Sequence, residues 1–136
     1  EARARRAFAG QAMMAHLGID IAELAPGAVS LRAPIRPEVS QHHGYAHAAL
    51  AFAAGDTAAG IAAQTLMAAD EGVLTIEMKI NLLAPAKGEA LIARGRVERA
   101  GRTVSVVRAD VFAEEAGRER HVATLLGTMA VIKGLG

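Results

Sequence analysis

The chain has 136 residues, which is the size of one ordinary domain and is enough to bury a core. Fifteen Lys and Arg residues stand against fourteen Asp and Glu residues, and this balance excludes a nucleic-acid-binding protein held mainly by phosphate contacts. Apolar residues make up 52% of the chain, which excludes intrinsic disorder. The lack of Cys excludes a disulfide scaffold, a thiolate zinc site and a cysteine nucleophile, and it agrees with our expectation of a cytoplasmic protein.

The first part of the chain predicts a short helix and then a β-hairpin. Residues 2–16 have the apolar spacing of an amphipathic helix, and Gly18 is expected to end it. Two apolar runs, residues 19–24 and 28–33, flank the dipeptide Pro26-Gly27, which favours a tight turn. We therefore expect these two runs to pair as a hairpin.

Residues 1–8 lack the apolar core of a secretory signal, so we expect no such signal within them. The chain begins with Glu1 and not with Met, so the question of whether residues precede it stays open.

A loop over residues 34–47 and a long alanine-rich helix over residues 48–69 are predicted next. The helix is long enough to cross a bilayer, and Asp56 is its only formal charge. However, Ala and Gly dominate it in place of Leu, and Gln64 adds a second polar group. A helix buried inside a folded domain is therefore expected, and no membrane partner.

Four strands are predicted in the second half. Residues 74–82 alternate between apolar and polar side chains, so we expect one face of this strand to be buried. Further strands are expected over residues 89–99, 103–113 and 120–132, separated by glycine turns. Strands joined by short turns pair antiparallel, so the four are expected to form a meander.

A helix with almost no polar face needs cover on nearly every side, and a curved antiparallel sheet wrapped around it supplies that cover. Glycine within a helix costs roughly 1 kcal/mol relative to alanine, so Gly55 and Gly60 suggest close packing against strands. The sequence thus predicts an α+β fold in a single domain, residues 1–136, with the sheet around one long central helix.

Asp56 is the unusual residue, since a carboxylate in an apolar helix must be paired, hydrogen-bonded, neutralised or exposed in a cleft. It could cap a helix that restarts after Gly55, or face a partner chain. It could instead be a general base or a nucleophile in a crevice of low dielectric. Spacing does not separate these two catalytic roles, because both need the same carboxylate in the same place.

Three histidines, His42, His43 and His47, lie within six residues just before the long helix. Their spacing is weak evidence for a metal, and no carboxylate lies beside them, so no metal site is predicted. The start of the helix matters more, because its first backbone N–H groups are unpaired and the helix dipole lies behind them. Such amides stabilise a developing oxyanion, and the amide of Ala48 is the candidate donor.

These residues resemble a known family. The segment from His47 to Ala58 resembles the H-G-G-x6-D-[TS]-A signature of hot-dog acyl-CoA thioesterases, in the phenylacetyl-CoA thioesterase-like branch. The likeness covers roughly residues 39–133 and is strengthened by four further segments: QHHGYAH at 41–47, TIEMKINLLAPA at 75–86, GRT at 101–103 and GTMA at 127–130. Ala48 and Ala49 replace the two glycines of the signature.

The resemblance implies a role for each matching residue. Asp56 would activate water or attack the thioester carbonyl, and Ala48 would supply the oxyanion N–H. His47 would orient that loop, Gln41 would hold the water or the carbonyl, and Thr75 would bind near the carboxylate. The site would lie between two subunits of a homo-oligomer, a dimer or a dimer of dimers.

Substrate contacts follow from the same likeness. The substrate would be an acyl-CoA, with no metal or separate cofactor. The expected contact residues are Gly44, Tyr45, Ala49, Asn81, Arg99 and Arg102. Arg99 and Arg102 either meet the coenzyme A phosphates or belong to a solvated strand face with Arg94 and Arg96. Tyr45 and Phe52 line an acyl pocket or fill the core.

The sequence therefore leads to an acyl-CoA thioesterase, with two other functions left open. One is a hot-dog module that binds acyl-CoA without hydrolysing it. The other is an acyl-thioester hydratase or dehydratase, for which His47 and Asp56 make a poor catalytic pair.

Overall fold

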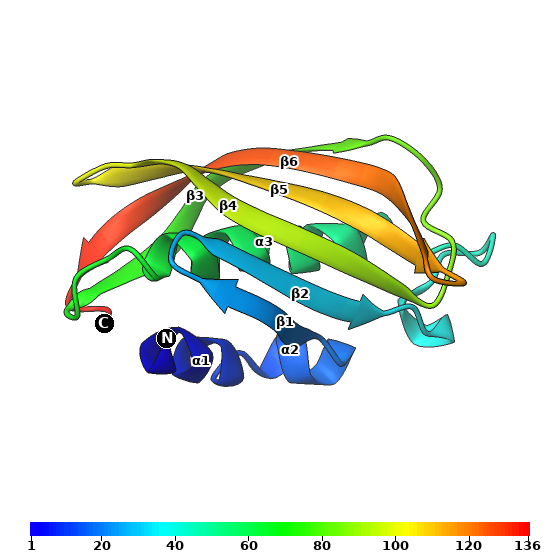
Figure 1. The fold of residues 1–136 in the computed structure, drawn as a ribbon, viewed down its shortest axis with the longest axis horizontal. Coiled ribbons are helices and arrows are strands. Elements are labelled where there is room, and N and C mark those ends of the chain that lie inside the picture. Colours follow the sequence, from blue (N-terminus) through cyan, green and yellow to red (C-terminus); the bar gives the residue numbers. More distant parts are fainter.

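A six-stranded antiparallel sheet curves around one long helix in the computed structural model, which describes residues 1–136 (Figure 1). The elements in chain order are α1 (Ala2–Ala9), α2 (Ala12–Leu17), β1 (Asp20–Ala25), β2 (Ala28–Pro34), a 3-10 helix (Pro37–Val39), α3 (Ala48–Gln64), β3 (Glu71–Leu82), β4 (Ala90–Ala100), β5 (Val104–Glu115) and β6 (Arg118–Lys133). The predicted α+β fold, with the sheet around a central helix, is confirmed. None of the helices is both long and apolar enough to cross a membrane.

The N-terminal segment forms two helices and not the single helix predicted over residues 2–16. The helix α1 ends at Gly10, and Gln11 is extended with φ −86° and ψ 92° before α2 begins. Glycine is the weakest helix former except for proline, so the chain changes direction there at little cost. Gly18 ends α2 as expected, in a left-handed conformation with φ 68°.

The predicted hairpin is confirmed, with β1 and β2 antiparallel and Ala25 opposite Ala28 around the Pro26-Gly27 turn. Gly27 has φ 73°, a value that glycine adopts without steric cost. Its N–H also donates to Thr65 Oγ1 over 2.7 Å, which ties the turn to the C-terminal end of α3.

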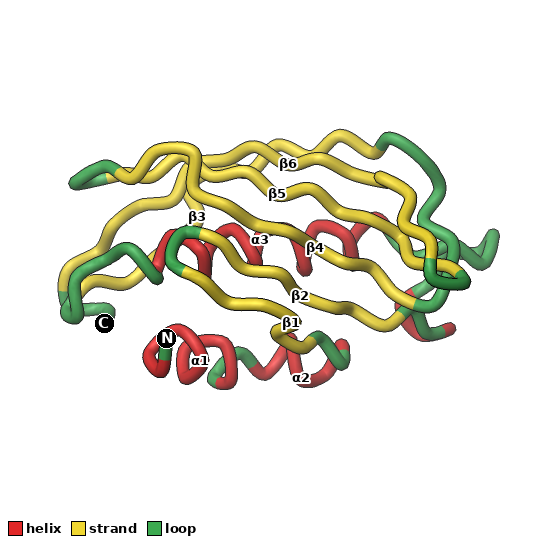
Figure 2. The backbone as a smooth tube through the Cα atoms, viewed as in Figure 1, coloured by secondary structure: helices red, strands yellow, loops and turns green.

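The expected four-strand meander is wrong at its first strand. The sheet order is β1-β2-β4-β5-β6-β3, so β3 pairs with β6 while β4 pairs with β2 and β5. The connection of residues 83–89 crosses one end of the fold and does not turn back as a hairpin (Figure 2). Its backbone bonds first to Val122 and then to Ala46 and Ile35, so one segment joins both sides of the curved sheet.

The backbone of the sheet lies in direct contact with the backbone of α3. A Cβ added to Gly95 of β4 would lie 2.3 Å from the carbonyl carbon of Ala58 and 2.4 Å from the nitrogen of Ala59. On the helix, a Cβ added to Gly55 would lie 2.9 Å from the Leu125 methyl groups. Small residues on both elements are therefore a steric requirement, as the alanine-rich sequence predicts.

The C-terminal end of α3 is held by the N-terminal helix. The helix ends at Gln64, five residues before the predicted Ala69. The Arg3 guanidinium donates to the Gln64 carbonyl over 2.8 Å and the Met67 carbonyl over 3.0 Å, and it also reaches the Ala68 carbonyl. The carbonyls of Gln64 and Ala68 also accept the backbone N–H groups of Met67 and Glu71, and the guanidinium adds a positive charge that stabilises the negative end of the helix dipole.

The prediction that one face of β3 is buried is wrong, because the strand carries a β-bulge between Thr75 and Glu77. An extra residue reverses the alternation of side chains, so Leu74 points outward while Met78 packs against the core. Leu74 and Ile76 are 56% and 58% exposed, respectively. The strand is also an edge of the sheet, so its outer backbone groups are unpaired.

Two glycine substitutions test the close approach of sheet and helix. Gly95→Ala is expected to lower the free energy of unfolding by about 3 kcal/mol or more, because its methyl group would meet helix backbone that cannot move aside. Gly60→Ala should be neutral or stabilise by up to about 1 kcal/mol, since its Cβ finds ordinary contact at 3.7 Å from the Met129 methyl. Urea unfolding measures both, and a Gly95→Ala protein as stable as the wild type would contradict the packing.

Candidate functional site

Asp56 lies within a continuous helix, so the interpretation of this residue as the cap of a restarted helix is wrong. Its side chain is partly buried, and Thr75 Oγ1 of β3 donates to its Oδ1 over 2.9 Å. The two residues line a hollow of about 250 Å³ between α3 and β3, together with Gln11, Val73 and Met129. The structure thus brings together two of the predicted site residues, Asp56 and Thr75.

Burial raises the pKa of the Asp56 carboxyl above its ordinary value, because desolvation disfavours the charged form. The hydrogen bond from Thr75 acts in the opposite direction and lowers the pKa of Asp56, but burial is the larger effect. A carboxylate with a raised pKa is a stronger base than an exposed one. The environment of Asp56 therefore suits proton abstraction.

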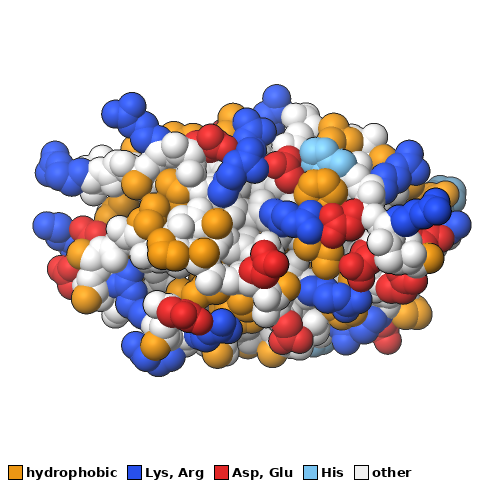
Figure 3. Space-filling view, in the orientation of Figure 1, with side chains coloured by type: hydrophobic (Ala, Val, Ile, Leu, Met, Phe, Trp, Pro, Cys, Tyr) orange, Lys and Arg blue, Asp and Glu red, His pale blue; other side chains and the backbone are white.

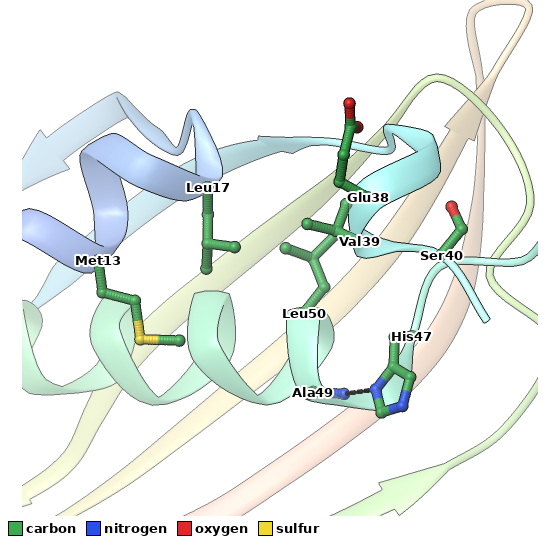
Figure 4. A pocket seen from close by; sticks show the side chains of 8 residues that line it. All are labelled: Met13, Leu17, Glu38, Val39, Ser40, His47, Ala49 and Leu50. Carbon is green, nitrogen blue, oxygen red and sulfur yellow. Dashed lines mark hydrogen bonds between the residues drawn. The ribbon is translucent and has the colours of Figure 1, made fainter.

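The start of α3 has one amide without a partner. His47 is the N-cap residue, and its Nδ1 accepts the N–H of Ala49 over 2.9 Å (Figure 4). The N–H of Leu50 donates to the carbonyl of His47. The N–H of Ala48 has no acceptor in the chain, because it belongs to the first helical residue. His47 therefore occupies the second amide and leaves the first one open.

The loop before α3 folds back on itself. The N–H of Gln41 donates to the Tyr45 carbonyl over 2.8 Å, and the N–H of Gly44 donates to the Gln41 carbonyl over 2.9 Å. The side-chain oxygen of Gln41 accepts the N–H of His43. Gly44 has φ 82°, so glycine is favoured at this position of the loop.

A second hollow, of about 580 Å³, lies at the start of α3. Gln41, Tyr45, His47 and Ala48 line it from one side, and residues 82–86 line it from the other. It holds the predicted oxyanion donor but not Asp56, which lines the separate hollow beside Thr75. One chain therefore carries two half-sites along α3. The first is the hollow of Ala48 at the start of the helix, and the second is the hollow of Asp56 near its middle.

The other predicted contact residues lie outside both half-sites. Asn81 is exposed on β3, and Arg99 and Arg102 are exposed at the end of β4 and in the turn after it. Ala49 lies in a third hollow, beside α2.

Arg94 and Arg96 belong to a solvated strand face, as one of the two interpretations had it. Arg94 makes two hydrogen bonds to Glu119, of 2.7 and 2.8 Å, and Arg96 bonds to Asp110 over 3.0 Å. Figure 3 shows acidic and basic side chains interspersed on this side of the molecule.

Two groups of residues that line these hollows were not identified from the sequence. Leu82 and Leu83 line the larger hollow, and an unusual pair of leucines ending a strand was the available signal. Met13 and Leu17 line the hollow beside α2. Their spacing of four residues predicts an amphipathic helix but gives no sign of a hollow beside it.

The histidine run does not form a metal centre. The rings of His42 and His43 contact one another, with centroids 3.9 Å apart, while His47 caps the helix. No group of three or more His, Asp or Glu side chains is arranged to hold a metal ion.

A curved antiparallel sheet wrapped around one alanine-rich helix is the architecture of the hot-dog class of proteins. Residues 43–119 match the family described as the thioesterase superfamily. The chain is also 32% identical over 117 residues to SSO1253 of Saccharolobus solfataricus, which is provisionally named an esterase, with 86% of this chain and 75% of that protein covered. The chain therefore belongs to the thioesterase superfamily.

Solved structures show the same fold. A thioesterase family protein from Silicibacter pomeroyi superposes with a TM-score of 0.94 at 40% identity, with 96% of each chain covered. The PaaI protein of the phenylacetic acid degradation operon of E. coli has a TM-score of 0.86 at 21% identity, over 96% of this chain and 91% of that one. The expected hot-dog fold is therefore confirmed.

The raised pKa of Asp56 has a consequence for stability. A folded state in which this pKa is raised binds more protons than the unfolded state between the two pKa values, so stability falls as pH rises through that window. We expect Asp56→Asn to raise the melting temperature at pH 7 relative to the wild type, because the amide has no charge to desolvate. This difference should shrink as pH falls below the ordinary range of aspartate. Thermal unfolding at several pH values checks this, and an Asp56→Asn protein less stable than the wild type at pH 7 would contradict it.

Proposed function

We propose that the protein is an acyl-CoA thioesterase, which hydrolyses an acyl-CoA to the free acid and coenzyme A. The observation that carries the proposal is the partly buried Asp56 carboxylate, a base of raised pKa, on the same helix whose first amide is open. Membership of the thioesterase superfamily supports the reaction type.

The proposed chemistry uses these two groups directly. The Asp56 carboxylate takes a proton from water while the water oxygen attacks the thioester carbonyl carbon. The carbonyl electron pair moves onto oxygen, where the N–H of Ala48 and the dipole of α3 stabilise the negative charge. Collapse of this intermediate reforms the carbonyl and breaks the carbon–sulfur bond, and the leaving thiolate takes the proton back from Asp56.

A second copy of the chain is needed to complete the site. Asp56 lies eight residues after Ala48 on α3, and a helix rises about 1.5 Å per residue, so their backbones are about 12 Å apart. Base and oxyanion donor must both lie within hydrogen-bond reach of one thioester. We therefore infer that Asp56 of one protomer works with Ala48, His47 and Gln41 of its partner.

The free edge of β3 supports this assembly. Its unpaired backbone groups and the exposed side chains of Leu74 and Ile76 form a surface that natural proteins normally cover. Accessible residues of α3 near this edge recur every three or four positions and so share one face: Ala49, Phe52, Ala53 and Asp56. A partner helix would pack against that face.

A two-fold axis would bring the half-sites together. If it passes near Phe52, Asp56 of one protomer faces Ala48 of its partner, because each lies four residues from Phe52. The β3 strands of the two protomers would pair antiparallel about the same axis. If the centre of that pairing lies between Met78 and Lys79, Thr75 of one protomer lies opposite Leu82 of its partner. The hollow of Asp56 then adjoins the hollow of Ala48 from the other chain.

The same assembly gives the two predicted arginines a role. Arg99 and Arg102 lie at the end of the sheet where Thr75 lies, since Thr75 pairs with Met129 and the first residue of β5 pairs with Ala130. Neither arginine has an acidic partner in the chain, so both are available to coenzyme A phosphates.

Thiol release from a panel of acyl-CoAs tests the proposed reaction. The protein has no Cys and gives no background with a disulfide dye. We expect the wild type to release thiol, and Asp56→Asn to lower kcat by about 100-fold or more, as removal of a general base does.

The oligomeric state of the variant, measured by light scattering, serves as the control. Full turnover by a folded Asp56→Asn protein would overturn the role of this carboxylate. Binding of acyl-CoA without any thiol release would favour the non-catalytic module, and hydration of an enoyl thioester would favour the hydratase.

Mixing two inactive variants tests whether the site is shared. Ala48→Pro removes the open N–H, and proline suits the first position of a helix because no hydrogen bond is lost there. His47 has φ −64° and ψ 143°, which a following proline allows. Ala48→Pro should lower kcat by about 100-fold, whereas the matched Ala48→Gly keeps the amide and most of the activity.

Co-expression of Asp56→Asn with Ala48→Pro is expected to restore about a quarter of wild-type activity, because half of the random dimers are mixed and each mixed dimer has one intact site. Each variant expressed alone should stay at its low level. A mixture as inactive as its components would show that base and oxyanion donor act within one chain.

A further inference from the structure

The third hollow lies between α2 and the first turns of α3 and has a volume of about 220 Å³ (Figure 4). Its apolar walls are the side chains of Met13, Leu17, Val39 and Leu50. Figure 4 shows Met13 and Leu17 pointing from α2 toward α3, and Leu50 pointing back toward Leu17. Nothing in the proposed reaction uses these side chains.

The polar groups around this hollow have their partners elsewhere. The hydroxyl of Ser40 donates to the Arg36 carbonyl over 2.7 Å, and Nδ1 of His47 accepts the N–H of Ala49. The carboxylate of Glu38 points away from Met13 and Leu50 in Figure 4. The interior therefore offers hydrocarbon contact and no unsatisfied polar group, and it suits a hydrocarbon better than a charged or polar ligand.

The hollow also lies beside the proposed reaction centre. His47 lines both this hollow and the larger one, while Ala48 and Ala49 line one each. A thioester whose carbonyl oxygen accepts the N–H of Ala48 therefore has a small apolar hollow on the α2 side. It has a hollow of about 580 Å³ on the side of residues 82–86. The two substituents of a thioester carbonyl correspond to these two hollows. The apolar acyl group suits the small hollow, and the longer, polar thiol arm suits the larger one.

The walls of the small hollow are fixed to one another. The guanidinium of Arg36 donates to the His16 carbonyl over 2.8 Å, which fastens the end of α2 to the segment before α3. The N–H of His47 donates to the Val39 carbonyl over 2.9 Å. Met14, next to Met13, is buried in the core and holds α2 against it. A preformed site of this kind binds without a large ordering cost.

We propose that this hollow between α2 and α3 is the acyl-binding pocket of the protein and that Met13 and Leu17 set the length of acyl group it accepts. The proposal rests on the thioesterase function proposed above. A methylene group and a water molecule each take up roughly 30 Å³ in the liquid, so the hollow holds about seven carbon atoms. The substrates are therefore acyl-CoAs of medium length, or acyl groups with one ring and a short linker. Methionine in the wall adapts to either shape.

The test measures kcat/KM for straight-chain acyl-CoAs from two to twelve carbons, and for one ring-bearing acyl-CoA. For the wild type, we expect kcat/KM to rise about three- to fourfold per methylene and to level off near eight carbons. Met13→Trp fills the hollow and should lower kcat/KM for octanoyl-CoA about tenfold or more, while acetyl-CoA changes by less than about threefold. Leu17→Ala enlarges the hollow and should move the plateau to longer chains, so the proposal does not depend on one variant folding.

Leu83→Trp is the comparison variant, because Leu83 lines the larger hollow. It should lower kcat/KM for all chain lengths by a similar factor. If Leu83→Trp shifts the chain-length preference and Met13→Trp and Leu17→Ala do not, the acyl group lies in the larger hollow and the proposal is overturned. A uniform loss in all three variants also overturns it.

Failure of the proposed function gives a different result. If the wild type hydrolyses no acyl-CoA, calorimetry with thioether analogues of the same chain lengths tests the pocket alone. Affinity should then rise with chain length up to about eight carbons in the wild type and about two carbons earlier in Met13→Trp. Affinity that is independent of chain length would overturn the pocket.

Discussion

The structure depends on one contact, between the backbone of Gly95 in β4 and the backbone of α3 at Ala58 and Ala59. This contact leaves no room for a Cβ at position 95, so the strand must have glycine there, and the helix residues facing it carry no more than a methyl group. Because the helix is enclosed by the sheet over much of its length, it needs almost no polar face. The few positions where α3 is open to solvent are therefore the positions where a polar residue can act, and Asp56 is one of them.

The same enclosure explains why the site is divided. The sheet and its crossing connection leave α3 accessible beside the free edge of β3 and at its N-terminus. A base on one turn and an oxyanion donor two turns earlier cannot converge on one carbonyl within a straight helix. A second helix running in the opposite direction removes this limit, because it sets the start of one helix beside the middle of the other. In the proposed function, an unpaired edge strand is thus part of the catalytic design.

The features that depend on neighbouring residues were predictable from the sequence, and those that depend on distant contacts were not. The Pro26-Gly27 turn and the buried alanine-rich helix follow from local chemistry, and the fold class follows from the need to cover that helix. The bulge after Thr75 is set by pairing with β6, which lies about fifty residues away along the chain, and periodicity alone gave the wrong face for Leu74. Similarly, the pairing of β4 with β2 results from closure of the sheet around α3. Asp56, Thr75 and Ala48 could be chosen individually from the sequence, but their division into two half-sites is visible only in three dimensions.

The residues of α2 that line the small hollow tolerate substitution better than the residues of α3. Where α3 lies tight against the strands, as at Gly55 and Ala58, a larger side chain would disturb the helix that carries the catalytic groups. Met13 and Leu17 belong to a short peripheral helix whose attachment depends on other residues, among them Met14 and Arg36. Substitutions in α2 can therefore alter the shape of a ligand-sized space while the machinery on α3 stays intact. A lineage with this architecture can diversify its substrates through the least constrained helix it has.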